Sequence, residues 1–213
     1  MSIRVWDPLV RICHWGIALL LPLCWYSADQ GEMELHQSAA YLLAALLFAR
    51  LSWGLFGSVP ARFSHFVRSP QVVLDYLRQW RAPRSPHLGH NPAGGYMVLL
   101  LWMLLLCQFA TGLFITDDIL TEGPLYGSVS ASLASWFSQY HGFGINLLLG
   151  AVALHLTAIA VYRLRGISLV TPMLHGKVVI NTAQPLLRPW PVALGWLIAW
   201  VIVVALWLIA PLW

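Results

Sequence analysis

The segment that decides the fold is residues 140–162, which read YHGFGINLLLGAVALHLTAIAVY. It is long and apolar enough to cross a bilayer, since a helix of about 20 residues spans the hydrocarbon core. Two histidines interrupt it, His141 and His155. At a rise of about 1.5 Å and a turn of about 100° per residue, both imidazoles lie on one helix face, about 21 Å apart. Ionisable groups inside a membrane are costly and indicate function by default.

The composition of the whole chain also predicts a membrane protein. Of its 213 residues, 59% are hydrophobic and 9% are charged, whereas a soluble domain carries about 25% charged residues. The apolar stretches predict five membrane-spanning helices: Pro8–Tyr26, His36–Phe56, Gly95–Ile115, Tyr140–Tyr162 and Trp190–Leu212. Asp7 and Pro8 form a typical helix start, and a short amphipathic piece, Pro70–Trp80, is expected in the headgroup plane. The fold class is therefore all-α, an integral membrane bundle.

The charged residues distinguish the two sides of this bundle. All twelve Lys and Arg lie at or near one side of the predicted spans. The connections 27–35 and 116–139 on the other side contain no Lys or Arg but six acidic residues: Asp29, Glu32, Glu34, Asp117, Asp118 and Glu122. Because Lys and Arg accumulate in cytoplasmic loops, we expect a cytoplasmic N-terminus and, after five spans, a periplasmic C-terminus. The net charge of +4 then reflects topology and lipid contact rather than a nucleic-acid surface.

Two further histidines match the depths of the first two. His36 opens the second predicted span, level with His141, and His14 lies about two turns inside the first span, level with His155. Imidazoles on facing helices suit the two axial positions of a haem iron, whereas zinc or copper needs three or four ligands at one point. The pattern predicts two haem irons, one bound by His14 with His155 and the other by His36 with His141. Four separate, hydrogen-bonded histidines are the alternative.

Three arginines are candidate partners for haem propionates. Arg50 lies fourteen residues after His36 and therefore shares its helix face at the inner level. A lone guanidinium at that depth needs an anion, which a propionate supplies. The alternative is an arginine whose side chain extends to the cytoplasmic headgroups. Arg11 and Arg163, near the inner ends of the first and fourth spans, are candidates of the same kind.

Several short segments carry a family resemblance. They are VWDPLVR (5–11) with CHW (13–15), FARLSWG (48–54), ARF (61–63), HLGHNP (87–92), TGLF (111–114), EGPL (122–125) and LVTPMLHG (169–176). These segments resemble the bacterial cytochrome b561 family, which includes the cytochrome b subunits of nickel–iron hydrogenases and thiosulfate reductases. The resemblance covers about residues 3–178 and implies a four-helix core with two haems b on the same four histidines.

The resemblance also implies exchange of electrons with quinone and with a partner redox protein. We therefore expect a dihaem cytochrome of the bacterial inner membrane that connects the quinone pool with a periplasmic partner, such as a c-type cytochrome attracted by the acidic loops. Residues 1–188 would form the dihaem domain and residues 189–213 an additional transmembrane helix. The polar candidates for quinone on the inner side are Asp7, His87, His90 and Asn91; loops that only face water are the alternative.

Other functions stay open at this point. The chain could act alone as a superoxide oxidase or quinone reductase, or it could anchor a hydrogenase- or reductase-type complex as its cytochrome b subunit. A haem-free transporter or membrane scaffold is the alternative from another class.

Overall fold

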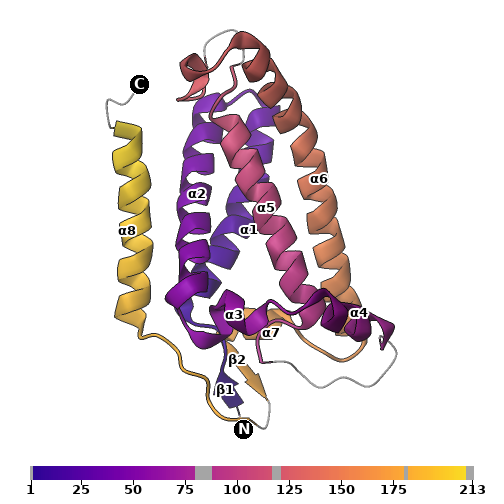
Figure 1. Ribbon diagram of the computed structural model, residues 1–213. Coiled ribbons are helices and arrows are strands. Elements are labelled where there is room, and N and C mark those ends of the chain that lie inside the picture. The colour runs from indigo at the N-terminus through magenta and orange to yellow at the C-terminus, as the bar shows by residue number, and fades with distance from the viewer. Residues whose placement is uncertain (1, 80–87, 117–120, 180–181, 210–213) are drawn as a thin grey trace.

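The computed structural model describes residues 2–79, 88–116, 121–179 and 182–209 (Figure 1). Five helices within this part of the chain are long and apolar enough to cross a membrane. They are α1 (Pro8–Asp29), α2 (Met33–Phe56), α5 (Pro92–Gly112), α6 (Ala131–Leu164) and α8 (Trp190–Ile209). All five predicted spans are therefore confirmed, and the protein is an all-α membrane bundle. Leu212, the predicted end of the fifth span, lies outside the described residues.

The helix ends differ from the predicted spans where polar groups extend a helix. Helix α6 begins at Ala131 rather than near Tyr140, because the hydroxyl of Ser130 accepts a hydrogen bond from the backbone N–H of Leu133 and caps an earlier start. Hydropathy marks only the part of a helix that is apolar. Pro22 lies inside α1, which continues through it to Asp29.

The start of α1 is confirmed and has a second role. One carboxylate oxygen of Asp7 accepts from the backbone N–H of Val10 at 3.0 Å. The other accepts from the indole N–H of Trp53 in α2 at 2.9 Å. Asp7, which is 2% exposed, therefore caps α1 and ties it to α2.

The four helices α1, α2, α5 and α6 form the bundle, and α8 stands outside it against α2 (Figure 1). A buried apolar cluster joins all four helices: Cys24, Ala39, Leu43, Leu47, Leu105 and Leu148. Helix α8 is held by Ser52 of α2, whose hydroxyl accepts from the indole N–H groups of Trp196 and Trp200, both at 2.9 Å. The four-helix core and the extra helix are thus visible as separate layers.

Short elements cover the end of the bundle that we call the inner end. They are 3-10 helix η1 (Val59–Ala61) and helices α3 (Phe63–Phe66), α4 (Pro70–Arg78) and α7 (Val170–His175). Strand β1 (Ser2–Arg4) pairs antiparallel with β2 (Lys177–Val179) beside them. The sequence does not predict this pair, because each strand has three residues and the partners lie at opposite ends of the chain. The outer end carries only the 3-10 helix η2 (Tyr126–Ser128) among the described residues.

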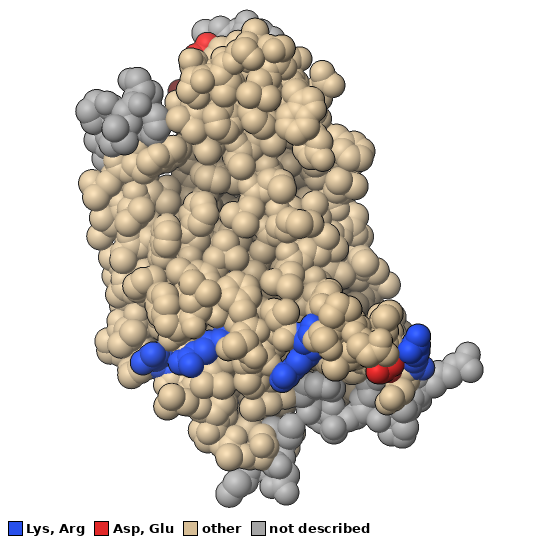
Figure 2. Space-filling view, in the orientation of Figure 1, with Lys and Arg blue, Asp and Glu red and all other residues tan. Residues whose placement is uncertain are grey.

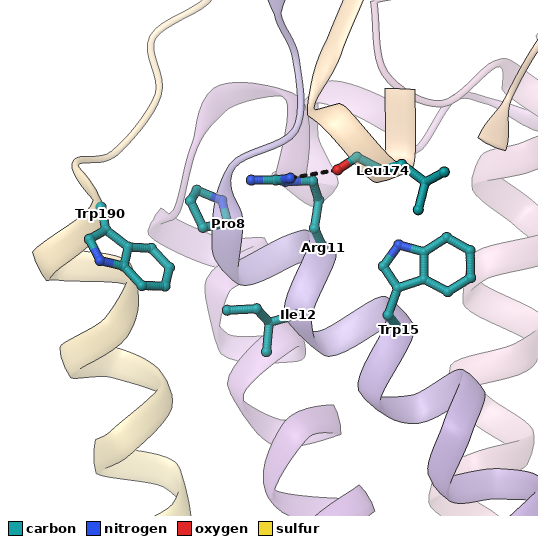
Figure 3. Close-up of a pocket in the computed structure, with 6 residues that line it drawn as sticks. All are labelled: Pro8, Arg11, Ile12, Trp15, Leu174 and Trp190. Atoms are coloured by element: carbon teal, nitrogen blue, oxygen red, sulfur yellow. Dashed lines mark hydrogen bonds between the residues drawn. The ribbon is translucent and has the colours of Figure 1, made fainter. Parts of the chain in front are cut away.

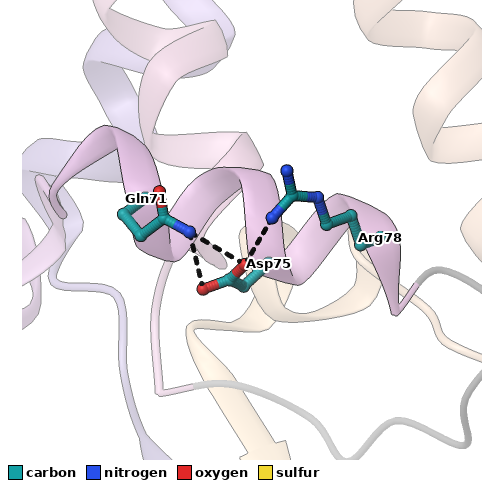
Figure 4. Close-up of polar contacts among 3 residues, drawn as sticks. All are labelled: Gln71, Asp75 and Arg78. Atoms are coloured by element: carbon teal, nitrogen blue, oxygen red, sulfur yellow. Dashed lines mark hydrogen bonds and ion pairs between the residues drawn. The ribbon is translucent and has the colours of Figure 1, made fainter.

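Helix α4 is the predicted amphipathic piece. Its polar side holds Asp75, which accepts from the Gln71 amide at 3.2 and 3.3 Å and pairs with Arg78 at 3.2 Å (Figure 4). Its apolar side chains Leu74 and Leu77 are exposed, as expected of a helix in the headgroup plane. Trp80, the predicted end of this piece, lies outside the described residues.

Lys and Arg side chains gather near the inner end of the molecule. Figure 2 shows those of one face as a band there, with a single acidic group among them. The other acidic groups on this face lie at the outer end. The charge separation that the sequence predicts is therefore present, although Asp117 and Asp118 fall outside the described residues.

Candidate functional site

Two histidines face each other across a cavity at the outer end of the bundle. His36 lies in the first turn of α2 and His141 lies in α6. Their ring centroids are 6.3 Å apart, and the ring planes make an angle of 80°. Both line a cavity of about 260 Å³ between α1, α2, α5 and α6. Most of its walls are apolar and include Leu21, Ala40, Leu105 and Ile145. The structure thus brings together the two histidines of the predicted outer pair.

A backbone carbonyl of α1 orients the ring of His36. Its Nδ1 lies 2.8 Å from the carbonyl oxygen of Cys24. Because a carbonyl oxygen can only accept, Nδ1 carries the proton, and the lone pair of Nε2 is left free. A histidine that donates through one ring nitrogen and binds through the other is the usual arrangement at metal sites.

A hydroxyl of α5 orients the ring of His141 in the same way. Nδ1 of His141 lies 3.2 Å from Oγ1 of Thr111. This hydroxyl donates its own proton to the carbonyl of Cys107, 2.8 Å away, and so accepts from His141. The Nε2 lone pair of His141 is therefore free as well. Gly112 gives the ring its space, since a Cβ there would lie 3.0 Å from Cε1 of His141.

The outer pair fits a metal ion held between two imidazoles. Imidazole nitrogens bind transition metals at about 2 Å, and a ring centroid lies about 1 Å behind its nitrogen, so two rings on opposite sides of one ion have centroids about 6 Å apart. The observed separation is 6.3 Å. Two axial nitrogens in a mostly apolar cavity are the donor set of a six-coordinate haem.

The second pair, His14 and His155, lies toward the inner end. His14 is in α1 and His155 is in α6, and their imidazoles are close enough to interact electrostatically. Nδ1 of His14 is buried and has no hydrogen-bond partner among the described residues. Buried polar atoms without a partner are rare and call for an explanation, such as a bound group. In the inner pair, His14 therefore has a buried nitrogen available to a ligand.

Arg50 lies at the same inner end and is buried. Its side chain is 4% exposed, so it does not extend to the headgroups, which was the alternative for this residue. NH1 and NH2 both donate to the carbonyl oxygen of Ala61 at 3.3 Å. The guanidinium also lies 4.8 Å from the ring centroid of Trp102. Arg50 is thus a buried cation at the level of the inner pair.

The other two predicted arginines lie in more open places. NH1 of Arg11 donates to the carbonyl of Leu174 at 2.7 Å, in a pocket between α1, α7 and α8. Figure 3 shows Trp15 and Trp190 on either side of this guanidinium. Arg163 is exposed in the last turn of α6. Neither arginine is fully buried, and their roles toward a haem stay predictions.

Two of the four residues predicted as polar contacts for quinone, Asp7 and Asn91, are hydrogen-bonded within the protein. Both carboxylate oxygens of Asp7 accept hydrogen bonds from the chain. Asn91 caps α5 and donates to the hydroxyl of Tyr162 at 3.2 Å. His90 packs between aromatic rings, and His87 lies outside the described residues.

His90 lies beside the inner pair, which the sequence did not predict. Its ring centroid is 4.8 Å from that of Trp6 and 4.9 Å from that of Phe66. Burial among these groups is the main cause that lowers the pKa of His90 to about 3. Smaller contributions come from four neighbouring groups: Arg50, His14, His155 and His65. His90 is thus buried between Trp6 and Phe66.

A family comparison decides between the classes of protein that such histidine pairs allow. Residues 5–176 match the family model described as prokaryotic cytochrome b561. The chain belongs to the prokaryotic cytochrome b561 family. No curated protein and no solved structure matches it.

Membership confirms the resemblance and what it implies in general terms. This cytochrome b561 is a multi-pass membrane protein that binds haem b and transfers electrons. All four histidines of the two pairs lie within the matched residues, whereas α8 lies beyond them. Among the residues that the structure describes, no group of three or more metal-binding side chains lies together.

The groups that orient the outer histidines in this cytochrome b561 were not predicted. The partner of His36 is the backbone carbonyl of Cys24, and every residue has such a carbonyl, so the sequence does not indicate it. Thr111 and Gly112 could have been noticed in the sequence, because a hydroxyl residue beside a glycine is unusual in an apolar span. Both belong to the segment TGLF. Their role becomes visible only when α5 is packed against His141 of α6.

Proposed function

We propose that this cytochrome b561 holds two haems b and passes electrons across the bacterial inner membrane. His36 and His141 would bind the outer haem, and His14 and His155 the inner one. The observation that carries the proposal is the outer pair. The ring centroids of His36 and His141 lie 6.3 Å apart across a mostly apolar cavity, and each ring has a free Nε2 lone pair.

The arrangement of the pairs supports a path for electrons. His141 and His155 both lie on α6, about 21 Å apart along its axis, which is less than the hydrocarbon thickness of about 30 Å. Haem b, when bound, supplies the one-electron chemistry of its iron. The chain would hold each haem through a pair of imidazoles, and it surrounds the outer pair with mostly apolar side chains. Such a site favours electron transfer over oxygen binding.

The surface charges support an orientation and two electron partners. The arginine band at the inner end favours a cytoplasmic N-terminus. Four described acidic residues at the outer end are exposed: Asp29, Glu32, Glu34 and Glu122. They would attract a basic periplasmic partner such as a c-type cytochrome, while quinone in the membrane would be the other partner.

The packing of α8 supports the proposed division of the chain. Residues 1–188 would form the dihaem unit, and residues 189–213 would add a helix that contacts α2 from outside. This helix contributes no residue to the cavity of the outer pair.

Pyridine haemochromogen analysis of the purified chain tests the cofactor assignment. We expect about two haems b per chain. His36→Ala should remove the outer haem and His155→Ala the inner one, so that each variant keeps one. His175→Ala, which alters an exposed histidine of α7, is the matched control and should keep both. Retention of two haems in either ligand variant would refute the ligand assignment.

The other functions considered for this core are separated by experiments on the purified protein. Rapid reduction of haem by superoxide in stopped-flow, with the chain alone, would favour a superoxide oxidase over a relay. Co-purification of a hydrogenase or reductase subunit would favour an anchor subunit.

A further inference from the structure

The inner end contains a buried cation, Arg50, that forms no ion pair with any residue that the structure describes. The two terminal nitrogens of Arg50 share one carbonyl oxygen, that of Ala61, at the long distance of 3.3 Å. A buried charge is costly unless it is paired and fully hydrogen-bonded. The hydrogen-bonding capacity of this guanidinium, which has five N–H donors, is therefore only partly used by the described residues.

Two imidazoles near Arg50 each have an Nδ1 atom without a hydrogen-bond partner among the described residues. Nδ1 of His90 and Nδ1 of His65 are buried, and neither has a hydrogen-bond partner in the part of the chain that the structure describes. Phe66 and Trp102 connect these side chains: the ring centroid of Phe66 lies 4.9 Å from that of His90 and 6.3 Å from that of Trp102, and the guanidinium of Arg50 lies 4.8 Å from the Trp102 centroid. His65 directly precedes Phe66 in the chain. Unpartnered buried nitrogens are few in native proteins, and here two of them accompany a guanidinium.

The nearby acidic side chain does not satisfy these donors. Asp7 is buried and acts electrostatically on Arg50. Both of its oxygens already accept, one from the backbone of Val10 and one from the indole of Trp53. Arg50 therefore has N–H donors that the described residues leave unused. Nδ1 of His90 and Nδ1 of His65 can donate beside it when they carry the ring proton. An anion from outside the described protein would satisfy all three groups.

We propose that His90, His65 and Arg50 form a carboxylate-binding niche that holds a propionate of the inner haem. The inference rests on the proposed function, because it requires a haem between His14 and His155. A carboxylate accepts several N–H donors at once, and such charge-assisted hydrogen bonds are stronger than neutral ones. Cys13 and Ala49, the chain neighbours of His14 and Arg50, share one buried cluster with Trp6, and the ring of Trp6 contacts His90. The niche therefore adjoins the end of α1 that carries His14.

The test is a potentiometric titration of the haem-loaded, full-length protein with variants of the niche. His90→Ala and His65→Ala should each lower the reduction potential of the inner haem, because a propionate with fewer N–H donors favours the ferric state. The expected change in the reduction equilibrium constant is up to about tenfold, or about 59 mV for one electron. The resonance Raman band of propionate bending should shift in the same variants.

Three further variants make the result specific. His90→Gln keeps an N–H donor and should restore most of the potential. His175→Ala, an exposed histidine at the same end, should change nothing. The titration repeated in the His36→Ala background, which would retain only the inner haem, assigns the shift to that haem.

The outcomes separate this inference from the proposed function. An inner-haem potential that stays the same in both His90→Ala and His65→Ala would overturn the niche while leaving the dihaem proposal intact. A wild-type protein without an inner haem would instead overturn the proposed function. If His90→Ala does not accumulate, the test uses His65→Ala and His90→Gln. A lowered inner-haem potential in His65→Ala together with a near-normal potential in His90→Gln supports the niche. Any other pair of results refutes it.

Discussion

At the scale of single residues, a hydroxyl of α5 sets the proton position on His141. We expect Thr111→Val to leave Nδ1–H of His141 without its acceptor, 3.2 Å away in the native protein. Loss of such an orienting partner typically weakens metal binding by about 10- to 100-fold. The outer haem should therefore dissociate more readily, which haem transfer to apomyoglobin measures, while the inner haem is retained.

Thr157→Val is the matched control for this prediction. Thr157 also lies within a spanning helix and donates to a backbone carbonyl, that of Ala153 at 2.8 Å, but its side chain is exposed. Equal haem loss from the Thr111 and Thr157 variants would contradict an orienting role for Thr111.

A second residue-scale prediction concerns the space around His141. Gly112→Ala introduces a Cβ 3.0 Å from Cε1 of the ring, so the imidazole must move by a few tenths of an ångström. We expect partial loss of the outer haem in haem-to-protein ratios, although alanine favours the helix itself by about 1 kcal/mol. Gly150→Ala, at a position of α6 with nothing within 4 Å, should gain the helix benefit and keep both haems.

The sequence predicts the candidate ligand histidines of the site, but it does not predict the groups that orient them. The ligand candidates could be predicted because histidine is rare in apolar helices and the period of a helix converts spacing into depth. The partners of His36 and His141 could not, because they are a backbone carbonyl and a hydroxyl on other helices. The same holds for His90, whose loop position in the sequence suggests exposure, whereas its Nδ1 is buried.

At the scale of elements, the hydroxyl of Ser52 in α2 accepts hydrogen bonds from two tryptophans of α8. Ser52→Ala would leave the indole N–H groups of Trp196 and Trp200 without their acceptor. Interhelical hydrogen bonds in membranes contribute about 0.6 kcal/mol each on average, so docking should weaken by about 1 kcal/mol. Hydrogen exchange of α8 amides should accelerate with haem content unchanged. Ser64→Ala, an exposed serine of α3, serves as control.

A chain ended after Arg188 tests the division into a core and an extra helix. Because α8 lies outside the four-helix bundle and lines no part of the outer cavity, we expect the shortened protein to bind both haems with unchanged spectra. Its stability should fall, since α8 covers an apolar face of α2. Loss of either haem on truncation would contradict the proposed boundary.

The elements themselves could be predicted where they are long and apolar. Five spans and the amphipathic α4 follow from hydropathy and periodicity. The early start of α6 could not be predicted from hydropathy, because a serine cap sets its first turn. The β1–β2 pair depends on the bundle to bring its two strands together, and no local pattern signals it.

At the scale of the whole molecule, the charge asymmetry predicts the orientation in the membrane. Alkaline phosphatase fused after residue 213 should be active, because the C-terminus is expected in the periplasm. The same reporter fused after residue 188 should be inactive, because that point precedes the last span. Green fluorescent protein should give the opposite pattern at the two positions. Equal activity at both sites would contradict five spans or the orientation.

Because His141 and His155 lie on the same helix, α6 alone sets the distance between them. Because both ligands belong to one uninterrupted backbone, tilting or sliding of α1 or α2 cannot change the separation of these two anchors. Inserting four residues between them would lengthen it by about 6 Å but rotate one ring by about 40°. Insertion of seven would add about 10 Å with only about 20° of rotation. In the proposed dihaem protein, insertions or deletions in α6 would therefore change the distance between the two haem sites only in discrete increments.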